Sequence, residues 1–90
     1  MIEKEKLLEK IPLTEEGFDT LRKILKNVGK AYPPSFTLVK GQREEFLDEV
    51  HGCIYGKDIF EQRECLINLL SERSINPKIE EIIKKDLKME

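Results

Sequence analysis

The chain has 90 residues, of which 38% are charged and 39% hydrophobic, and its 16 basic and 18 acidic side chains give a formal net charge of -2. No stretch approaches the roughly 18 apolar residues of a transmembrane helix, and the mixed charges at the N-terminus do not resemble a signal peptide. Opposite charges are interleaved, whereas nucleic-acid binding requires clustered lysine and arginine. We therefore predict a cytoplasmic protein, folded as a single domain over residues 1–90, with no membrane or nucleic-acid partner.

Two helices are predicted before residue 30. Residues 2–11 form the first, and Pro12 ends it. The second begins after Thr14, a good N-cap residue, and runs to about Val28, with Gly29 as a left-handed stop. Apolar side chains recur along it at the helical period. These are Phe18, Leu21, Ile24, Leu25 and Val28.

Residues 30–41 interrupt the helical pattern. The pair Pro33-Pro34 cannot continue a helix, and Phe36–Val39 favours an extended backbone. Because one strand cannot form a sheet, we interpret the segment as an ordered, extended loop packed on the helices. The side chains expected to pack there are Tyr32, Phe36 and Val39. The alternative is an α+β domain in which Phe36–Val39 pairs with another strand.

The segment from residue 42 to residue 72 predicts two further helices. One covers about 42–51, and the fragment Gly52–Gly56 ends it as a turn or a helical kink. The other follows Asp58, whose carboxylate can cap it, and continues to about Glu72. The apolar residues expected to face inward in the first of these helices are Phe46, Leu47 and Val50. The second is the most apolar helix, and its stripe is wide enough for a central position in a bundle. Its apolar residues are Ile59, Phe60, Leu66, Ile67, Leu69 and Leu70.

A fifth helix begins after the capping residue Asn76, with Pro77 at the first helical position. Its apolar edge consists of Ile79, Ile82, Ile83 and Leu87. This edge must pack on the same chain, on a second copy or on a partner. A homodimer through the last two helices and a closed monomer remain as alternatives. The whole pattern predicts an all-α fold, a compact bundle of four to five short helices with an extended Pro-Pro loop at about 30–41.

Cys53 and Cys65 are the two cysteines, and their spacing matches no zinc or redox motif. In a cytoplasmic chain we expect both to be reduced residues that pack in the interior. A disulfide between them requires that their two segments fold back tightly on each other.

His51, the single histidine, follows Asp48 at a spacing of three residues, which places both on one helix face. Together with Cys53 they could supply three metal ligands. Carboxylate-bridged metal sites usually take a second histidine from another helix, which this chain lacks. We therefore predict no metal ligands and interpret His51 as a residue that suits a helix C-terminus.

Two segments resemble parts of one known domain. Pro12–Leu21 is similar to the start of the N-terminal coiled-coil domain of bacterial Gre transcript-cleavage factors, and Ile54–Lys57 is similar to a segment after the acidic tip of that domain. The resemblance implies a tip that enters the RNA polymerase secondary channel and carboxylates that help to hold a catalytic metal. By position, Asp48 and Glu49 would lie near that tip. A polymerase-directed factor, or a metal-dependent factor using these two residues with His51, is therefore the alternative function.

The preferred function follows from the apolar helix faces. Several amphipathic helices share a small domain, which leaves apolar surface for a partner. We predict a small non-enzymatic adaptor or regulator that binds another protein, with no catalytic residues and no cofactor. The residues expected to contact the partner are Ile79, Ile82, Ile83, Leu87, Tyr32 and Tyr55.

Overall fold

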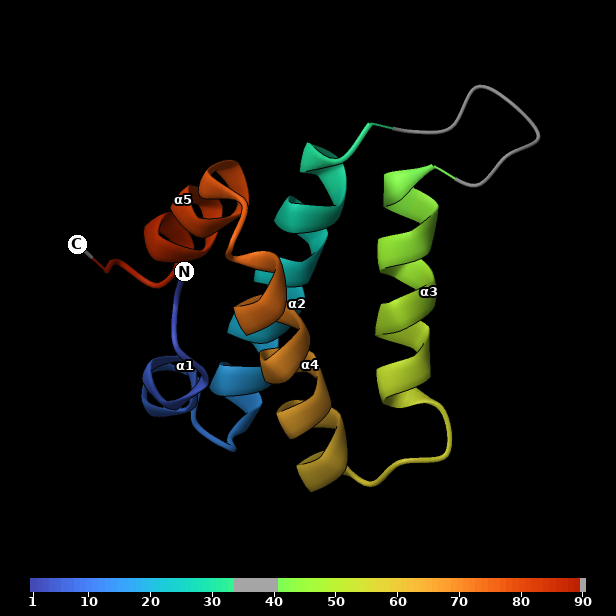
Figure 1. Ribbon diagram of the computed structural model, residues 1–90. Helices are drawn as coiled ribbons and strands as arrows, with labels where there is room; N and C mark the ends of the chain where they lie inside the picture. The colour runs from blue at the N-terminus through green and yellow to red at the C-terminus, as the bar shows by residue number, and fades with distance from the viewer. Residues whose placement is uncertain (34–40, 90) are drawn as a thin grey trace.

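The computed structural model describes residues 1–33 and 41–89, and the regular structure of these residues is entirely helical (Figure 1). The helices are α1 (Lys4–Lys10), α2 (Glu15–Ala31), α3 (Gln42–Ile54), α4 (Ile59–Arg73) and α5 (Pro77–Asp86). The prediction of an all-α bundle is confirmed. The segment Phe36–Val39, on which the α+β alternative depended, lies outside the described residues, as does the rest of the predicted loop from 34 to 40.

The predicted N-caps form the hydrogen bonds that their side chains allow. Each cap oxygen accepts a bond from a backbone N–H in the first helical turn, at donor–acceptor distances of 2.9–3.0 Å. The caps are Thr14 for α2, Asp58 for α4 and Asn76 for α5. These three helix starts therefore follow from local chemistry alone.

The predicted glycine stops are wrong at two positions. The helix α2 continues through Gly29 to Ala31, and α3 continues through Gly52 to Ile54. Among the described glycines, positive φ occurs at Gly56, where φ is 70°. A glycine ends a helix only where the chain takes the left-handed conformation, and Gly56 does so within the turn between α3 and α4.

The helices α2 and α4 lie in the middle of the bundle. Figure 1 shows α1 and α5 on one side of this pair and α3 on the other. The helix α4 packs on α1 and α3, and α2 packs on α3 and α5. The largest fully buried apolar side chains come from all five helices and from the turn after α1; they are Leu7, Ile11, Leu21, Ile24, Val28, Phe46, Ile67, Leu70, Ile79 and Ile83.

Two arginines join the C-terminal ends of helices to other parts of the bundle. The Arg43 Nε on α3 donates to the carbonyl oxygens of Gly29 and Tyr32, at 3.1 and 2.9 Å. The Arg63 guanidinium on α4 donates to the carbonyl oxygens of Leu8 and Ile11, both at 2.9 Å. These bonds reach carbonyl groups at the C-terminal ends of α1 and α2, where the regular helical hydrogen bonds run out; the Gly29 oxygen also accepts from the Tyr32 N–H.

Candidate functional site

Four large apolar side chains are exposed where α3 turns into α4. The exposed fractions are 41% for Ile54, 82% for Tyr55, 54% for Ile59 and 62% for Phe60. We call these four residues the turn patch. Ile59 and Phe60, which the sequence places in the apolar stripe of a central helix, are therefore exposed. The prediction that Leu47 faces inward is wrong, because Leu47 is 44% exposed. The described helices cover the side chains in the later turns of α4 and leave its first turn open.

The backbone beneath the turn patch is held by hydrogen bonds. The Gln62 Nε2 donates to the carbonyl oxygens of Lys57 and Ile54, at 2.8 and 3.3 Å. The Lys57 Nζ donates to the carbonyl oxygen of Gly52 at 2.8 Å. Asp58 caps the first turn of α4. The exposed side chains therefore stand on an ordered turn.

A groove adjoins the turn patch. It has a volume of about 440 Å³ and runs between the start of α2 and the start of α4. Its lining residues are Leu13, Thr14, Glu15, Phe18, Arg22, Ile59 and Gln62. Ile59 belongs to both the groove and the turn patch, so the two form one continuous feature. Leu13, Phe18 and Ile59 supply its apolar surface, and the other four lining residues are polar or charged.

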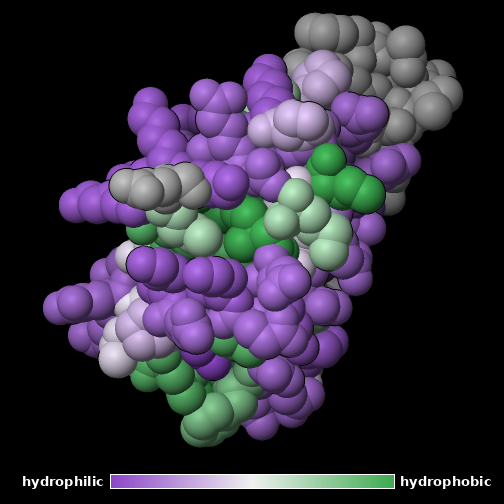
Figure 2. Space-filling view, turned by 60° about the vertical axis from the view of Figure 1, so that its left-hand side comes forward, coloured by the Kyte–Doolittle hydropathy of each residue, from purple (hydrophilic) through white to green (hydrophobic). Residues whose placement is uncertain are grey.

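The neighbouring face of the molecule is mostly hydrophilic. Figure 2 shows hydrophobic side chains on this face in a band across the middle and in a second area at the lower end. Because Figures 1 and 2 share a vertical axis, the lower area lies at the height at which α4 begins. One of the two hydrophobic areas on this face therefore lies at the end of the bundle that holds the turn patch, and the other lies across its middle.

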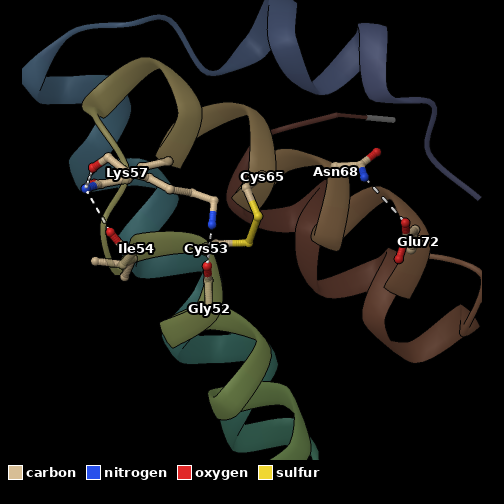
Figure 3. The surroundings of a disulfide bond; sticks show 8 residues. Gly52, Cys53, Ile54, Lys57, Cys65, Asn68 and Glu72 are labelled. Atoms are coloured by element: carbon tan, nitrogen blue, oxygen red, sulfur yellow. Dashed lines mark hydrogen bonds between the residues drawn. A yellow bond between two sulfur atoms is a disulfide. The ribbon is translucent and has the colours of Figure 1, made fainter.

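A disulfide joins Cys53 at the end of α3 to Cys65 on α4, and their Cα atoms are 5.3 Å apart (Figure 3). The prediction that both cysteines are reduced is wrong. Antiparallel packing of α3 on α4 through a short turn provides the tight fold-back that a disulfide requires. The bond closes a loop of chain, and all four residues of the turn patch lie inside it.

The structure separates the residues predicted to contact a partner. Ile79, Ile83 and Tyr32 are buried, at 1%, 0% and 7% exposure, and Ile82 and Leu87 pack against the core. Tyr55, at 82% exposure, is the member of that set that projects into solvent. The apolar edge of α5 is thus covered within the same chain, largely by α2. The residues that the sequence analysis did not assign to a surface are Ile54, Ile59 and Phe60.

Two of the residues considered for a metal, Cys53 and Glu49, take part in other interactions. Cys53 carries no free thiol, because its sulfur is in the disulfide. Glu49 forms an ion pair with Arg73, whose guanidinium carbon lies 5.6 Å from the centre of the Tyr32 ring. Within residues 1–33 and 41–89, no three His, Cys, Asp or Glu side chains are placed to hold a metal ion.

The carboxylates singled out by the Gre resemblance also lie elsewhere than at a tip. Asp48 and Glu49 are in the middle of α3, and the described chain is a bundle with extents of 39 × 34 × 18 Å.

Comparison of the chain with protein-family models, with curated proteins and with solved structures finds no match. None of the helices in the described part of the chain has the length and apolar character needed to cross a lipid bilayer.

Proposed function

We propose that this protein is a non-enzymatic adaptor or regulator that binds another protein through the turn patch and the adjoining groove. The observation that carries the proposal is the exposure of four large apolar side chains on one ordered turn. Tyr55 and Phe60 are aromatic, and aromatic side chains are enriched among the residues that dominate binding energy at protein interfaces.

The energetics of the turn patch favour association. A large apolar side chain contributes about 1.5–3 kcal/mol when it is fully removed from water. Ile59 and Phe60 are each more than half exposed in the free chain. Burial of these side chains by a partner can therefore still supply a substantial part of that free energy. The hydrogen bonds from Gln62 and Lys57 order the turn before binding, which lowers the entropic cost of association.

The proposed location is the cytoplasm. In that reducing environment a disulfide does not persist passively, and those that occur in mesophilic cytosolic proteins are usually catalytic or redox-sensing. In the cytoplasm the Cys53–Cys65 bond would therefore be one that other thiol proteins open and re-form, not a passive crosslink.

Site-specific photo-crosslinking tests the proposed function. Phe60→benzoylphenylalanine places a photoreactive group in the turn patch, and Ile75→benzoylphenylalanine places it at a 74% exposed residue between α4 and α5. We expect one discrete protein adduct in the native cell from position 60 and none from position 75. Ile59→Ser should abolish the adduct, whereas the matched control Ile75→Ser should leave its yield unchanged. Equal labelling from both positions, or insensitivity to Ile59→Ser, would remove the support for this surface.

A further inference from the structure

We propose that the Cys53–Cys65 disulfide is a redox modification site: a partner protein dithiol opens it at Cys65, and its opening weakens binding by the turn patch. The regulatory half of this proposal rests on the proposed function, since it assumes that the turn patch binds a protein. The chemical half stands on the disulfide and its surroundings.

The position of the disulfide is the first argument. Cys53 and Cys65 are separated by 12 positions, and Ile54, Tyr55, Ile59 and Phe60 all lie between them. Figure 3 shows the sulfur–sulfur bond crossing from α3 to α4, with the Lys57 side chain reaching back toward Gly52 on the turn side. The covalent link therefore closes the loop that displays the turn patch.

Unequal access to the two sulfur-bearing residues is the second argument. Cys53 is only 4% exposed and belongs to the core, whereas Cys65 is partly exposed. A shallow depression of about 240 Å³ opens beside them. It is lined by Glu49, Gly52, Cys53, Cys65, Asn68, Leu69 and Glu72. A thiolate from solvent therefore reaches Cys65 more readily than Cys53, and exchange depends on such access.

The exchange is a two-step, two-electron reduction. A thiolate of the reducing dithiol attacks the Cys65 Sγ, which forms a mixed disulfide and releases the Cys53 sulfur as a thiolate that takes up a proton. The second thiol of the reductant loses its proton and attacks its own sulfur in the mixed disulfide, and Cys65 leaves as a thiolate that is then protonated. The chain gains two electrons and two protons, and the dithiol becomes a disulfide.

The way in which α3 is held is the third argument. Upstream of Cys53, α3 buries Phe46 and Val50 in the core, and Arg43 binds the end of α2. Downstream of Cys53, the turn is held by the disulfide, by the Asp58 cap and by the hydrogen bonds of Lys57 and Gln62. We therefore expect reduction to leave the bundle packed, while the turn, held then by its cap and hydrogen bonds without the covalent link, gains conformational freedom. A partner then pays the ordering cost on binding, and we expect about tenfold weaker association.

The first experiment measures exchange alone. The oxidised protein is incubated under native conditions with a thioredoxin-type dithiol, and free thiols are alkylated and counted by mass spectrometry. We expect two thiols to appear while the far-ultraviolet circular dichroism remains helical. A reductant with a single active cysteine should be trapped as a mixed disulfide on Cys65. Trapping on Cys53, or exchange only as fast as global unfolding, would overturn the proposal and identify the bond as a structural one, without touching the proposed function.

The second experiment measures the consequence for the turn. Amide hydrogen exchange of residues 54–60 should accelerate after reduction and in the permanently open variant Cys53→Ser/Cys65→Ser, while exchange in α2 and α5 stays the same. The wild-type protein after reduction keeps this test valid even where the double variant folds poorly. Unchanged exchange at 54–60 would contradict the proposal.

The third experiment links the bond to binding. Phe60→benzoylphenylalanine is crosslinked in native-cell lysate with the disulfide intact and after reduction by the dithiol. The adduct yield should fall about tenfold on reduction at limiting protein concentration. Equal yields in both states would overturn the regulatory role. Absence of the adduct in both states would overturn both the regulatory role and the proposed function. The thiol count of the first experiment shows independently whether the disulfide was exchanged.

Discussion

The two ends of α4 contain similar apolar residues but present them differently. Near its C-terminal end, Leu69 and Leu70 are buried, and Ser71 and Ser74 hydrogen-bond the backbone of Ile2 at 2.7 Å. At its N-terminal end, Ile59 and Phe60 remain more than half exposed. The difference lies in the neighbours, because α5 and the N-terminal segment gather at the C-terminal end of α4. Apolar residues on a helix therefore mark surface that can be buried. Whether the same chain buries it depends on which elements pack beside that part of the helix.

The largest effect should come from placing a charge at each end in turn. Ile83 on α5 is 0% exposed. Ile83→Glu would bury a carboxylate without a partner and should lower the free energy of unfolding by about 4 kcal/mol or more. Phe60→Glu, at a position 62% exposed, should change the free energy of unfolding by less than about 0.5–1 kcal/mol. Urea titration followed by circular dichroism measures both. Similar losses in the two variants would mean that the turn patch belongs to the core.

The next effect concerns the disulfide at the open end. A loop of this length, with a sequence separation of 12 between the cysteines, is expected to contribute about 3 kcal/mol through restriction of the unfolded chain. Cys53→Ser/Cys65→Ser should therefore lower the stability by about 2–3 kcal/mol while the helical content is retained. Thermal unfolding of the variant, compared with wild type with and without reductant, checks this value. A variant that equals the oxidised wild type would show that packing alone holds α3 on α4.

Two glycines should respond in opposite directions. A Cβ at Gly17 in the first turn of α2 would lie 1.8 Å from the carbonyl oxygen of Pro12, whereas nothing lies within 4 Å of one at Gly52 on α3. Gly17→Ala should cost about 1–3 kcal/mol because the backbone of the α1–α2 turn must move. Gly52→Ala should instead stabilise by about 0.5–1 kcal/mol, since alanine is the better helix former. Denaturant midpoints measure both, and a stabilising Gly17→Ala would contradict the close approach.

The part of the fold that follows from the sequence is the part set by local chemistry. Thr14, Asp58 and Asn76 cap their helices as predicted, because a cap bond joins residues only two or three positions apart. The disulfide could not be predicted in this way, since Cys53 and Cys65 meet only through the packing of α3 on α4.

The candidate site was predicted less completely for a related reason. Tyr55, which is predicted to contact a partner, is exposed, whereas Ile59 and Phe60 belong to the predicted apolar stripe of α4 and are exposed as well. Periodicity identifies a face of a helix and does not reveal how far along its axis the neighbouring helices extend. The helix α4 begins beyond the cover that its neighbours provide, so its first turn is open even though it continues the apolar pattern. The short segment between Cys53 and Asp58, which holds Gly56, was the available signal for a turn at this end.

The smallest effect should come from an ion pair at the covered end. The N-terminal ammonium of Met1 donates a hydrogen bond to Glu80 on α5, and this bond lowers the pKa of the Glu80 carboxyl. A carboxyl whose pKa is lower in the folded than in the unfolded chain binds fewer protons when folded. Its contribution to stability is therefore present above the unfolded glutamate pKa of about 4.3, and it is lost as the pH falls through the lower folded value. Glu80→Gln should thus lower the melting temperature slightly at pH 7 and not at pH 2–3. Lys84 also forms an ion pair with Glu80 and lowers the pKa of the Glu80 carboxyl in the same direction. Melting curves of both proteins from pH 2 to 7 measure the difference, and a gap that widens toward low pH would show that the Met1–Glu80 pair does not hold this end of the bundle.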